Sequence, residues 1–230
     1  PSLASVALTP VKKYESPSLK YRGPSYWMPE KKGFTAEASA DEHGHEAWSI
    51  ATLRHRINHN RGFDRSDWFT NIGSGHSYFQ FLPTERYYDS HPEWYSLKEG
   101  VRQGKDAHKQ KYIFHGWQLC MTNKEAAKEF AKNMLVGIKQ KLDEGIPIDR
   151  MRLFVSPNDG QVMCECPNCS KLVDSDGSST SMVTHFANMV AAEIRKKYPT
   201  ARIVFYAYSN HCRPGDHVKP APGVYPELVF

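Results

Sequence analysis

The sequence lacks several features that would place the protein in a familiar class. Its apolar stretches fall well short of the ~18 residues that a membrane span needs, and no charged-then-apolar leader opens it, so we expect neither a membrane span nor a signal peptide in these residues. The excess of basic over acidic residues is small, 30 against 25, and does not indicate a nucleic-acid partner. With 40% hydrophobic residues, the chain is neither collagen-like nor wholly disordered.

Two common catalytic motifs are also missing. The absence of a Gly-x-Ser-x-Gly elbow disfavours a serine hydrolase, and the absence of a Gly-x-x-x-x-Gly-Lys loop excludes a standard phosphate-binding loop. Histidine and aromatic residues are instead abundant, with 11 His, 5 Trp and 12 Tyr. This composition is typical of a polar pocket that is walled by rings.

Hydrophobic periodicity predicts a parallel α/β fold. A capping box at Thr122–Glu125 precedes the strongest helix, whose apolar face runs from Ala127 to Leu142 and which ends at Gly145. A second helix is expected from Met182 to Ile194, closed by Pro199. Strands are expected at 20–27, 77–82, 115–121, 151–156, 202–208 and from Tyr225, and weaker helices at 47–59 and 84–90.

The order of strand, long polar loop and helix repeats about five times, which is typical of a (β/α)8 TIM barrel. We expect residues 1–18, which carry three prolines and little periodicity, to be a linker or the end of a preceding domain. Residues 19–230 then form a partial barrel of five to six βα units, because a complete one takes about 250 residues. Unpaired strand edges would make such a piece poorly stable alone.

Candidate site residues lie at the ends of two expected strands, where ligands bind in α/β folds, and in one glycine-rich loop. Asn158 and Asp159 come directly after the most apolar strand; the alternative is a simple Asx turn. His76 ends a Gly-Ser-Gly segment whose backbone can approach a ligand closely; the alternative is a flexible loop with a surface histidine. Tyr206 and Tyr208 share one face of a strand, where they either line a pocket or belong to the core.

Cys164, Cys166 and Cys169 form a dense Cys-x-Cys-x-x-Cys motif. Its second half has the spacing of a zinc knuckle, for which Cys212 or a histidine could supply the fourth ligand. No second Cys-x-x-Cys supports zinc, and an odd total of five cysteines does not favour a simple disulfide set, so structural zinc and disulfides stay open as alternatives. Cys120, inside an expected strand, is interpreted as a small buried hydrophobe.

Six segments occur together in a specific order. They are Tyr21-Arg22-Gly23, Gly73–Ser77, His91–Trp94, Gln118–Asn123, Ser156–Gly160 with the Cys164–Cys169 motif, and Ala207-Tyr208. Taken together, they resemble one bacterial family, the domain of unknown function DUF4838. The resemblance covers roughly residues 17–230 and extends to glycoside hydrolase family 163, which that family includes.

The resemblance implies a (β/α)8 barrel that acts on glycans in a secreted or periplasmic setting. Characterised relatives are endo-β-N-acetylglucosaminidases that cleave complex N-glycans, and they imply a glycan substrate, no nucleic-acid partner and no cofactor for catalysis. Family members are often joined to an N-terminal domain shared with hexosaminidases and α-glucuronidases. We therefore expect such a domain, and a C-terminal remainder of the barrel, in the full-length chain.

The resemblance also implies roles for particular residues. In hexosaminidase-like barrels an acidic pair ends the fourth strand, and Asn158-Asp159 occupies that place by our count. Asp159 is expected to be the catalytic or acetamide-orienting acid, with Asn158 as its polar neighbour; the second carboxylate would be Glu165 or lie beyond Phe230. The residues expected to bind substrate are His76, Tyr206, Tyr208, Asn123 and Arg22.

Two other functions stay open from the sequence. A carbohydrate-binding or scaffold barrel without turnover would use the same pocket and differ only in lacking hydrolysis. A zinc-stabilised nucleic-acid module, based on the cysteine motif, would bind DNA in a salt-sensitive way, which the small net charge disfavours.

Overall fold

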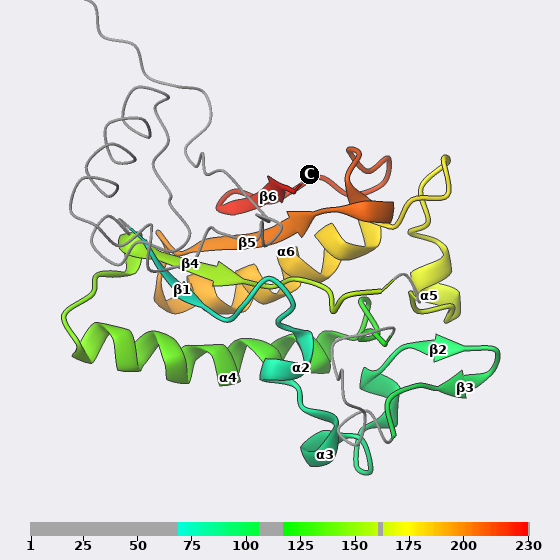
Figure 1. Ribbon diagram of the computed structural model, residues 1–230, viewed down its shortest axis with the longest axis horizontal. Coiled ribbons are helices and arrows are strands. Elements are labelled where there is room, and N and C mark those ends of the chain that lie inside the picture. Colours follow the sequence, from blue (N-terminus) through cyan, green and yellow to red (C-terminus); the bar gives the residue numbers. More distant parts are fainter. Residues whose placement is uncertain (1–68, 106–116, 161–162, 230) are drawn as a thin grey trace, which may run out of the picture. The chain divides into compact units, whose positions relative to one another are not determined.

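The computed structural model describes residues 69–105, 117–160 and 163–229 (Figure 1). The strand expected at 20–27, the helix expected at 47–59, Arg22 and the boundary near residue 18 lie outside the described residues. The division of the chain into a linker and a barrel therefore stays a prediction.

The described residues are organised around a parallel sheet of four strands. These are β1 (Thr70–Ile72), β4 (Met151–Phe154), β5 (Arg202–Ala207) and β6 (Val224–Leu228), and their order in the sheet is β1-β4-β5-β6. All three pairings are parallel. The predicted parallel α/β fold is confirmed, and the sheet order follows the chain order without a reversal.

Two long helices cover one face of this sheet. Helix α4 (Lys124–Asp143) precedes β4, and α6 (Thr180–Lys197) connects β4 to β5 (Figure 1). Paired residues of parallel strands point to the same face, and one such row is buried in a single cluster with apolar residues of both helices. That row is Ile72, Leu153, Ile203 and Val224. Burying an aliphatic side chain contributes about 1.5–3 kcal/mol, so this layer is a main source of stability.

The ends of α4 correct one sequence prediction and confirm another. The N-cap is Asn123, whose side-chain oxygen accepts a 3.0 Å hydrogen bond from the Ala126 amide; the capping box had placed the cap at Thr122. The helix ends at Asp143, and Gly145, the predicted stop signal, follows its C-cap residue. The φ of Gly145 is +82°, which suits a glycine after a C-terminal turn.

Short elements fill the long connection between β1 and α4. They are α2 (Tyr78–Phe81), α3 (Thr84–Tyr87), the 3-10 turn η1 (Pro92–Trp94) and the antiparallel hairpin of β2 (Leu97–Lys98) and β3 (Val101–Arg102). The predicted short helix at 84–90 is confirmed in its first turn. Later in the chain come the 3-10 turns η3 (Ile148–Arg150) and η4 (Ser209–His211) and the single turn α5 (Pro167–Ser170).

Two predicted strands are wrong. Residues 78–81 are helical, because Tyr78, Phe79 and Leu82 are buried at helical spacing, and this burial outweighs the strand preference of aromatic residues. Within the described residues 117–121 there is only an isolated antiparallel bridge, from Leu119 to Tyr95. The other predicted strands, at 151–156, 202–208 and from Tyr225, correspond to β4, β5 and β6.

The opposite face of the sheet is more polar than the helical face. Arg152 of β4 is 1% exposed and forms an ion pair with Glu227 of β6, while its guanidinium lies 4.9 Å from the Phe154 ring centroid. A buried arginine requires such a partner because an unpaired buried charge is costly.

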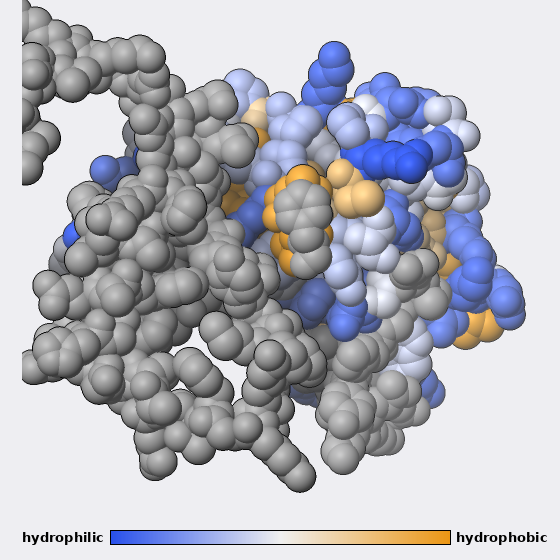
Figure 2. All heavy atoms as spheres, turned by 45° about the horizontal axis from the view of Figure 1, so that its top comes forward, coloured by the Kyte–Doolittle hydropathy of each residue, from blue (hydrophilic) through white to orange (hydrophobic). Residues whose placement is uncertain are grey.

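The outer surface is largely polar. On the face drawn in Figure 2, the described residues are mostly hydrophilic and the apolar ones form small separate patches. Scattered patches of this kind are normal for a solvated surface. None of the helices in the described ranges is long and apolar enough to cross a membrane.

Candidate functional site

Residues that follow β1, β4 and β5 line one pocket at the carboxyl edge of the sheet. Five of them were predicted from the sequence as site residues. They are His76, Asn158, Asp159, Tyr206 and Tyr208. The alternatives of a loose surface loop for His76 and of core positions for both tyrosines are thus not favoured.

His76 is fixed by a hydrogen bond to the β4 loop. Its Nδ1 lies 2.9 Å from the carbonyl oxygen of Pro157. A carbonyl oxygen only accepts, so Nδ1 carries the proton, and in the neutral ring Nε2 is left as an acceptor. The ring meets Tyr206 edge-on, with centroids 6.4 Å apart.

Gly75 is required by the position of the Tyr206 ring. A Cβ atom at Gly75 would lie 2.1 Å from Cε2 of Tyr206, far inside van der Waals contact. The backbone of Tyr206 is held as well, because its amide donates a 2.8 Å hydrogen bond to Oγ of Ser156. The glycine predicted to allow close approach thus admits a protein side chain that forms the pocket wall.

Asn158 is buried, at 2% exposure, and its polar groups are used within the protein. Its side-chain amide donates to the Trp117 carbonyl at 2.9 Å, and its backbone amide donates to Oε1 of Gln118 at 3.0 Å. Gln118 in turn donates through Nε2 to the carbonyls of Asn158 (2.7 Å) and Gly160 (3.2 Å). Asn158 therefore fixes the loop that carries Asp159.

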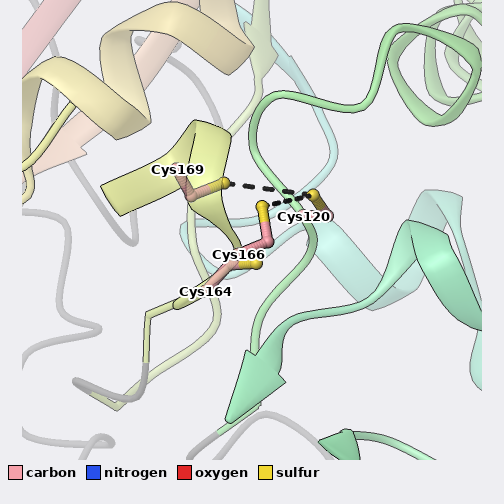
Figure 3. A group of neighbouring side chains, drawn as sticks. All are labelled: Cys120, Cys164, Cys166 and Cys169. Atoms are coloured by element: carbon pink, nitrogen blue, oxygen red, sulfur yellow. Dashed lines mark hydrogen bonds between the residues drawn. The ribbon is translucent and has the colours of Figure 1, made fainter. Parts of the chain in front are cut away.

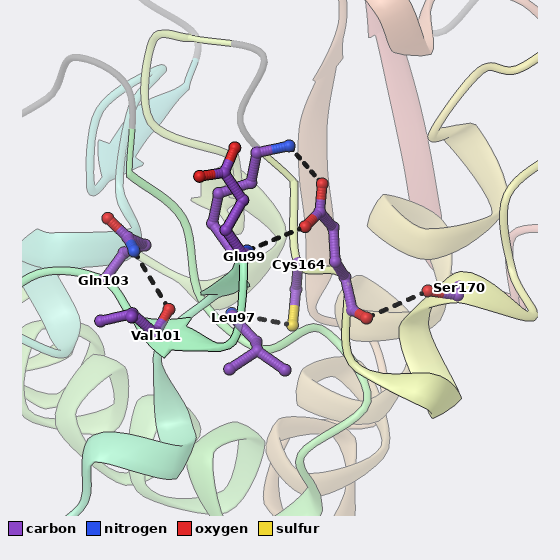
Figure 4. A network of polar contacts seen from close by, with 8 residues as sticks. Leu97, Glu99, Val101, Gln103, Cys164 and Ser170 are labelled. Atoms are coloured by element: carbon purple, nitrogen blue, oxygen red, sulfur yellow. Dashed lines mark hydrogen bonds and ion pairs between the residues drawn. The ribbon is translucent and has the colours of Figure 1, made fainter.

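Asp159 is half-buried at the pocket and is the one carboxylate among its described lining residues. Glu165, the sequence candidate for a second carboxylate, is not part of this lining. It is 46% exposed and forms an ion pair with Lys98 of the β2–β3 hairpin (Figure 4). A pocket with one carboxylate, imidazole groups and two phenols can exchange a proton with a ligand and can bind a polyhydroxylated ligand.

His211 is a pocket residue that the sequence prediction missed. It is 4% exposed, and this burial lowers its pKa to about 4, with a further lowering from His76 that a backbone hydrogen bond at Tyr206 opposes. The ring is therefore neutral at pH 7. Its position in η4, directly after β5, was the available signal, because side chains at the carboxyl ends of strands converge.

Asn123, predicted to bind substrate, is placed elsewhere. It caps α4, and its side-chain amide donates to the Glu93 carbonyl at 3.3 Å. It is not among the described residues that line the pocket. These two hydrogen bonds account for the residue structurally.

Four cysteines form a second, closed site (Figure 3). Cys120, Cys164, Cys166 and Cys169 are all buried, and their sulfur atoms lie within 4.8 Å of one another. All five cysteines of the chain are free thiols, so the disulfide alternative is wrong here. The expected fourth ligand is also corrected, because Cys212 is exposed outside the cluster and Cys120, interpreted as a small hydrophobe, takes that place.

The sulfur spacing suits a tetrahedral metal ion. The Sγ atom of Cys120 lies 3.7 Å from that of Cys166 and 3.9 Å from that of Cys169. Four sulfurs at ~2.3 Å from a central ion would be ~3.8 Å apart, whereas a disulfide joins sulfurs at ~2.05 Å. The cluster can therefore hold a metal ion.

The thiols of the cluster change one another's pKa values. Hydrogen bonds from the thiols of Cys164 and Cys169 hold the pKa of Cys120 well below its usual range. The same contact raises the pKa of Cys164 to about 11, and that of Cys169 also rises. The one thiolate would be a metal ligand, and a metal ion that binds all four sulfurs would displace the protons of the remaining thiols.

Backbone and hydroxyl groups surround these sulfurs. The Leu97 amide donates to Sγ of Cys164 at 3.3 Å (Figure 4). Oγ1 of Thr122 lies 3.3 Å from Sγ of Cys169. The Glu99 amide donates to the Glu165 carboxylate at 3.1 Å, which ties the cysteine loop to the β2–β3 hairpin. Hydrogen bonds of this kind orient metal ligands in known sites.

The fold and the pocket define the protein as a parallel α/β protein with a polar pocket at the carboxyl ends of its strands. The family described as Domain of unknown function (DUF4838) matches residues 1–229, so the chain belongs to this family and the resemblance to DUF4838 is confirmed. Comparison with curated proteins and with solved structures found no match.

Proposed function

We propose that the protein is a glycoside hydrolase that acts on N-acetylglucosamine-containing glycans, as the relation to glycoside hydrolase family 163 would imply. The observation that carries the proposal is the convergence of Asp159 with His76, Tyr206 and Tyr208 in one pocket at the carboxyl edge of the sheet. These residues come from three separate parts of the chain. A carboxylate supplies one of the two acidic groups that glycoside hydrolysis uses, and aromatic rings can bind the sugar.

The sheet topology supports the (β/α)8 barrel. In a doubly wound fold the strand order reverses and helices cover both faces. Here the order follows the chain, and α4 and α6 pack on the same face. A barrel places helices outside and packs its interior with layers of side chains, and the face of the sheet that carries Arg152 and Glu227 would be that interior.

Asp159 would act on the acetamide group or on the glycosidic oxygen. In the substrate-assisted route, the acetamide oxygen attacks the anomeric carbon as the glycosidic bond breaks, and a carboxylate accepts a hydrogen bond from the acetamide N–H. Asp159 takes this orienting role, and a second acid protonates the leaving oxygen. This second acid is not among the described residues that line the pocket, and we propose that it belongs to further βα units of the barrel.

The rest of the pocket would bind the sugar. Tyr208 is 38% exposed, so its ring face is available for stacking, and Tyr206 forms the adjoining wall. Nε2 of His76 accepts a hydrogen bond from a sugar hydroxyl, since Nδ1 is bonded to Pro157. Such sites combine apolar faces with a few placed polar groups.

We also propose that the four cysteines bind a structural zinc ion. Zinc sites of four thiolates are closed tetrahedra without a free position, so they stabilise a fold and do not take part in catalysis. The glycan substrate is the reason to propose a secreted or periplasmic location, with an N-terminal hexosaminidase-like domain in the full-length protein.

A panel of N-glycans and aryl N-acetylglucosaminides, offered to the full-length protein, tests the proposed activity. We expect cleavage, and we expect Asp159→Asn to reduce kcat/KM by about 10²–10⁴-fold. Asp149→Asn is the matched control, because Asp149 is exposed in η3, at the opposite end of β4. Binding of glycans without cleavage of any of them would favour a carbohydrate-binding barrel, which the single pocket carboxylate also permits.

A further inference from the structure

The cysteine cluster joins two segments that are distant in the sequence. Cys120 precedes α4, whereas the other three cysteines follow β4 (Figure 3). A metal ion bound to all four sulfurs would therefore tie the start of α4 to the loop that leaves the sheet at β4. Asp159 lies in this same loop, five residues before Cys164.

The segment Trp117–Cys120 also contacts the other end of that loop. The Gln118 side chain is fully buried, and it accepts from the Asn158 amide while donating to the carbonyls of Asn158 and Gly160. Both neighbours of Asp159 are thus held by one side chain. The side chain of Asn158 adds a bond to the Trp117 carbonyl.

We infer that the metal ion bound by the four cysteines sets the position of Asp159 through the segment Trp117–Cys120, in which Gln118 is the positioning residue. Cys120 fixes one end of this segment, and Gln118, two residues earlier, transmits that position to the loop. The catalytic consequence of the inference rests on the proposed function, but the mechanical link does not.

The chemistry of Gln118 explains why an amide is needed there. Its oxygen accepts from an N–H and its nitrogen donates to two carbonyls, so it pairs with the loop backbone as a neighbouring strand would. Glutamate has nearly the same shape but has no donor when ionised, and it would place negative charge against the Asn158 carbonyl. Gln118→Glu therefore breaks the link with little change in volume.

Core packing of Leu119 and two backbone hydrogen bonds also hold the segment. The Cys120 amide donates to the Trp94 carbonyl at 2.8 Å, and the Ser96 amide donates to the Gln118 carbonyl at 2.9 Å. These bonds reach the η1–β2 region, which is itself tied to the cysteine loop by the Leu97 amide. Without a metal ion, the cluster would be held by thiol hydrogen bonds, which are weak.

Amide hydrogen exchange at Asn158 tests the link, because its N–H is the donor to Gln118. The protein would be measured with one equivalent of Zn²⁺ and again after the metal is removed by a chelator. We expect one bound ion and exchange at Asn158 at least ~10-fold faster without it. Failure to bind zinc, or unchanged exchange after its removal from a folded protein, would overturn the inference.

Hydrogen exchange in the variant Gln118→Glu is a second test of the link, and it does not require removal of the metal ion. We expect this variant to keep its zinc and to lose the protection of Asn158. Gln103→Glu, at a half-buried glutamine that donates to the Val101 carbonyl, should keep both the zinc and the protection. Unchanged protection in Gln118→Glu would also overturn the inference.

Activity then separates this inference from the proposed function. In full-length protein, Gln118→Glu should lower kcat about 10–100-fold with a smaller effect on KM, since small displacements of a reacting group cost rate. If the wild-type protein cleaves no glycan, the proposed function fails while the exchange result still decides the link. If it cleaves glycans and Gln118→Glu has wild-type kcat, the positioning role is wrong.

Discussion

The loop after β4 contains two polar regions that differ in their access to solvent. Ser156–Gly160 contributes to an open pocket, where Asp159 is half-buried and faces groups from three strand ends. Cys164–Cys169 contributes to a closed cluster, in which all sulfurs are buried and contact one another. A carboxylate that lines a pocket can meet a ligand, whereas a buried set of thiols can hold an ion. We therefore propose a catalytic role for the first region and a stabilising role for the second.

The largest effect is expected where the closed cluster is broken. Cys120→Ser removes one of four ligands and should lower the free energy of unfolding by about 4 kcal/mol or more, with a fall in Tm of roughly 10 °C. Cys212→Ser, at the exposed cysteine, should change it by less than about 0.5 kcal/mol. Thermal unfolding in the presence of zinc checks both; equal effects would contradict the assignment of Cys120 to a metal site.

The pocket wall should make stability depend on pH through His211. Its pKa is about 4 in the folded protein and ~6.5 in the unfolded chain, so the unfolded chain binds a proton first. Stability should then fall as pH drops from ~6.5 to ~4, by up to about 3 kcal/mol. Denaturant unfolding of His211→Gln should lack this slope, whereas His91→Gln, at an exposed ring, should keep it.

A methyl group at Gly75 should damage the open pocket. Gly75→Ala must displace the Tyr206 ring, which we expect to cost about 1–3 kcal/mol and to weaken glycan binding. Gly137→Ala is the control of opposite sign, because Gly137 lies inside α4 with its nearest neighbour at 3.4 Å, and alanine there should stabilise by up to ~1 kcal/mol. Wild-type stability and binding in Gly75→Ala would show that the wall adjusts.

The smallest effect is expected at Asn123, which belongs to neither region. Asn123→Ala removes an N-cap and should cost about 1 kcal/mol, while Asn123→Asp keeps an acceptor and most of the stability. Neither should alter glycan binding. Weaker binding with unchanged unfolding would instead restore the sequence-based role of Asn123 in binding substrate.

The sequence predicts most of the sheet and both long helices because their signals are local. Strand β4 is buried throughout and apolar apart from Arg152, and α4 and α6 have apolar faces at helical spacing. Strand β1 escaped prediction because it has three residues, one of them buried, and is defined by its pairing to β4.

The two sites differ in how many of their residues could be predicted from the sequence. Asn158, Asp159, Tyr206 and Tyr208 were predictable because they lie at the carboxyl ends of predicted strands, and parallel strand ends meet at one edge. His76 was proposed from its Gly-Ser-Gly segment alone, because β1 was not predicted. Cys120 was not predictable, since it lies 44 residues before Cys164 and only the tertiary fold shows that they meet. Gln118 escaped for the same reason, because its partners are backbone groups about 40 residues away.

Measuring binding and turnover separately in Asp159→Asn tests the central claim most directly. We predict that the full-length variant binds an N-acetylglucosamine-containing glycan within a few-fold of the wild-type affinity and hydrolyses it at least ~100-fold more slowly. Turnover at the wild-type rate would contradict the claim that this pocket, with Asp159 at its centre, is a glycan-hydrolysing site.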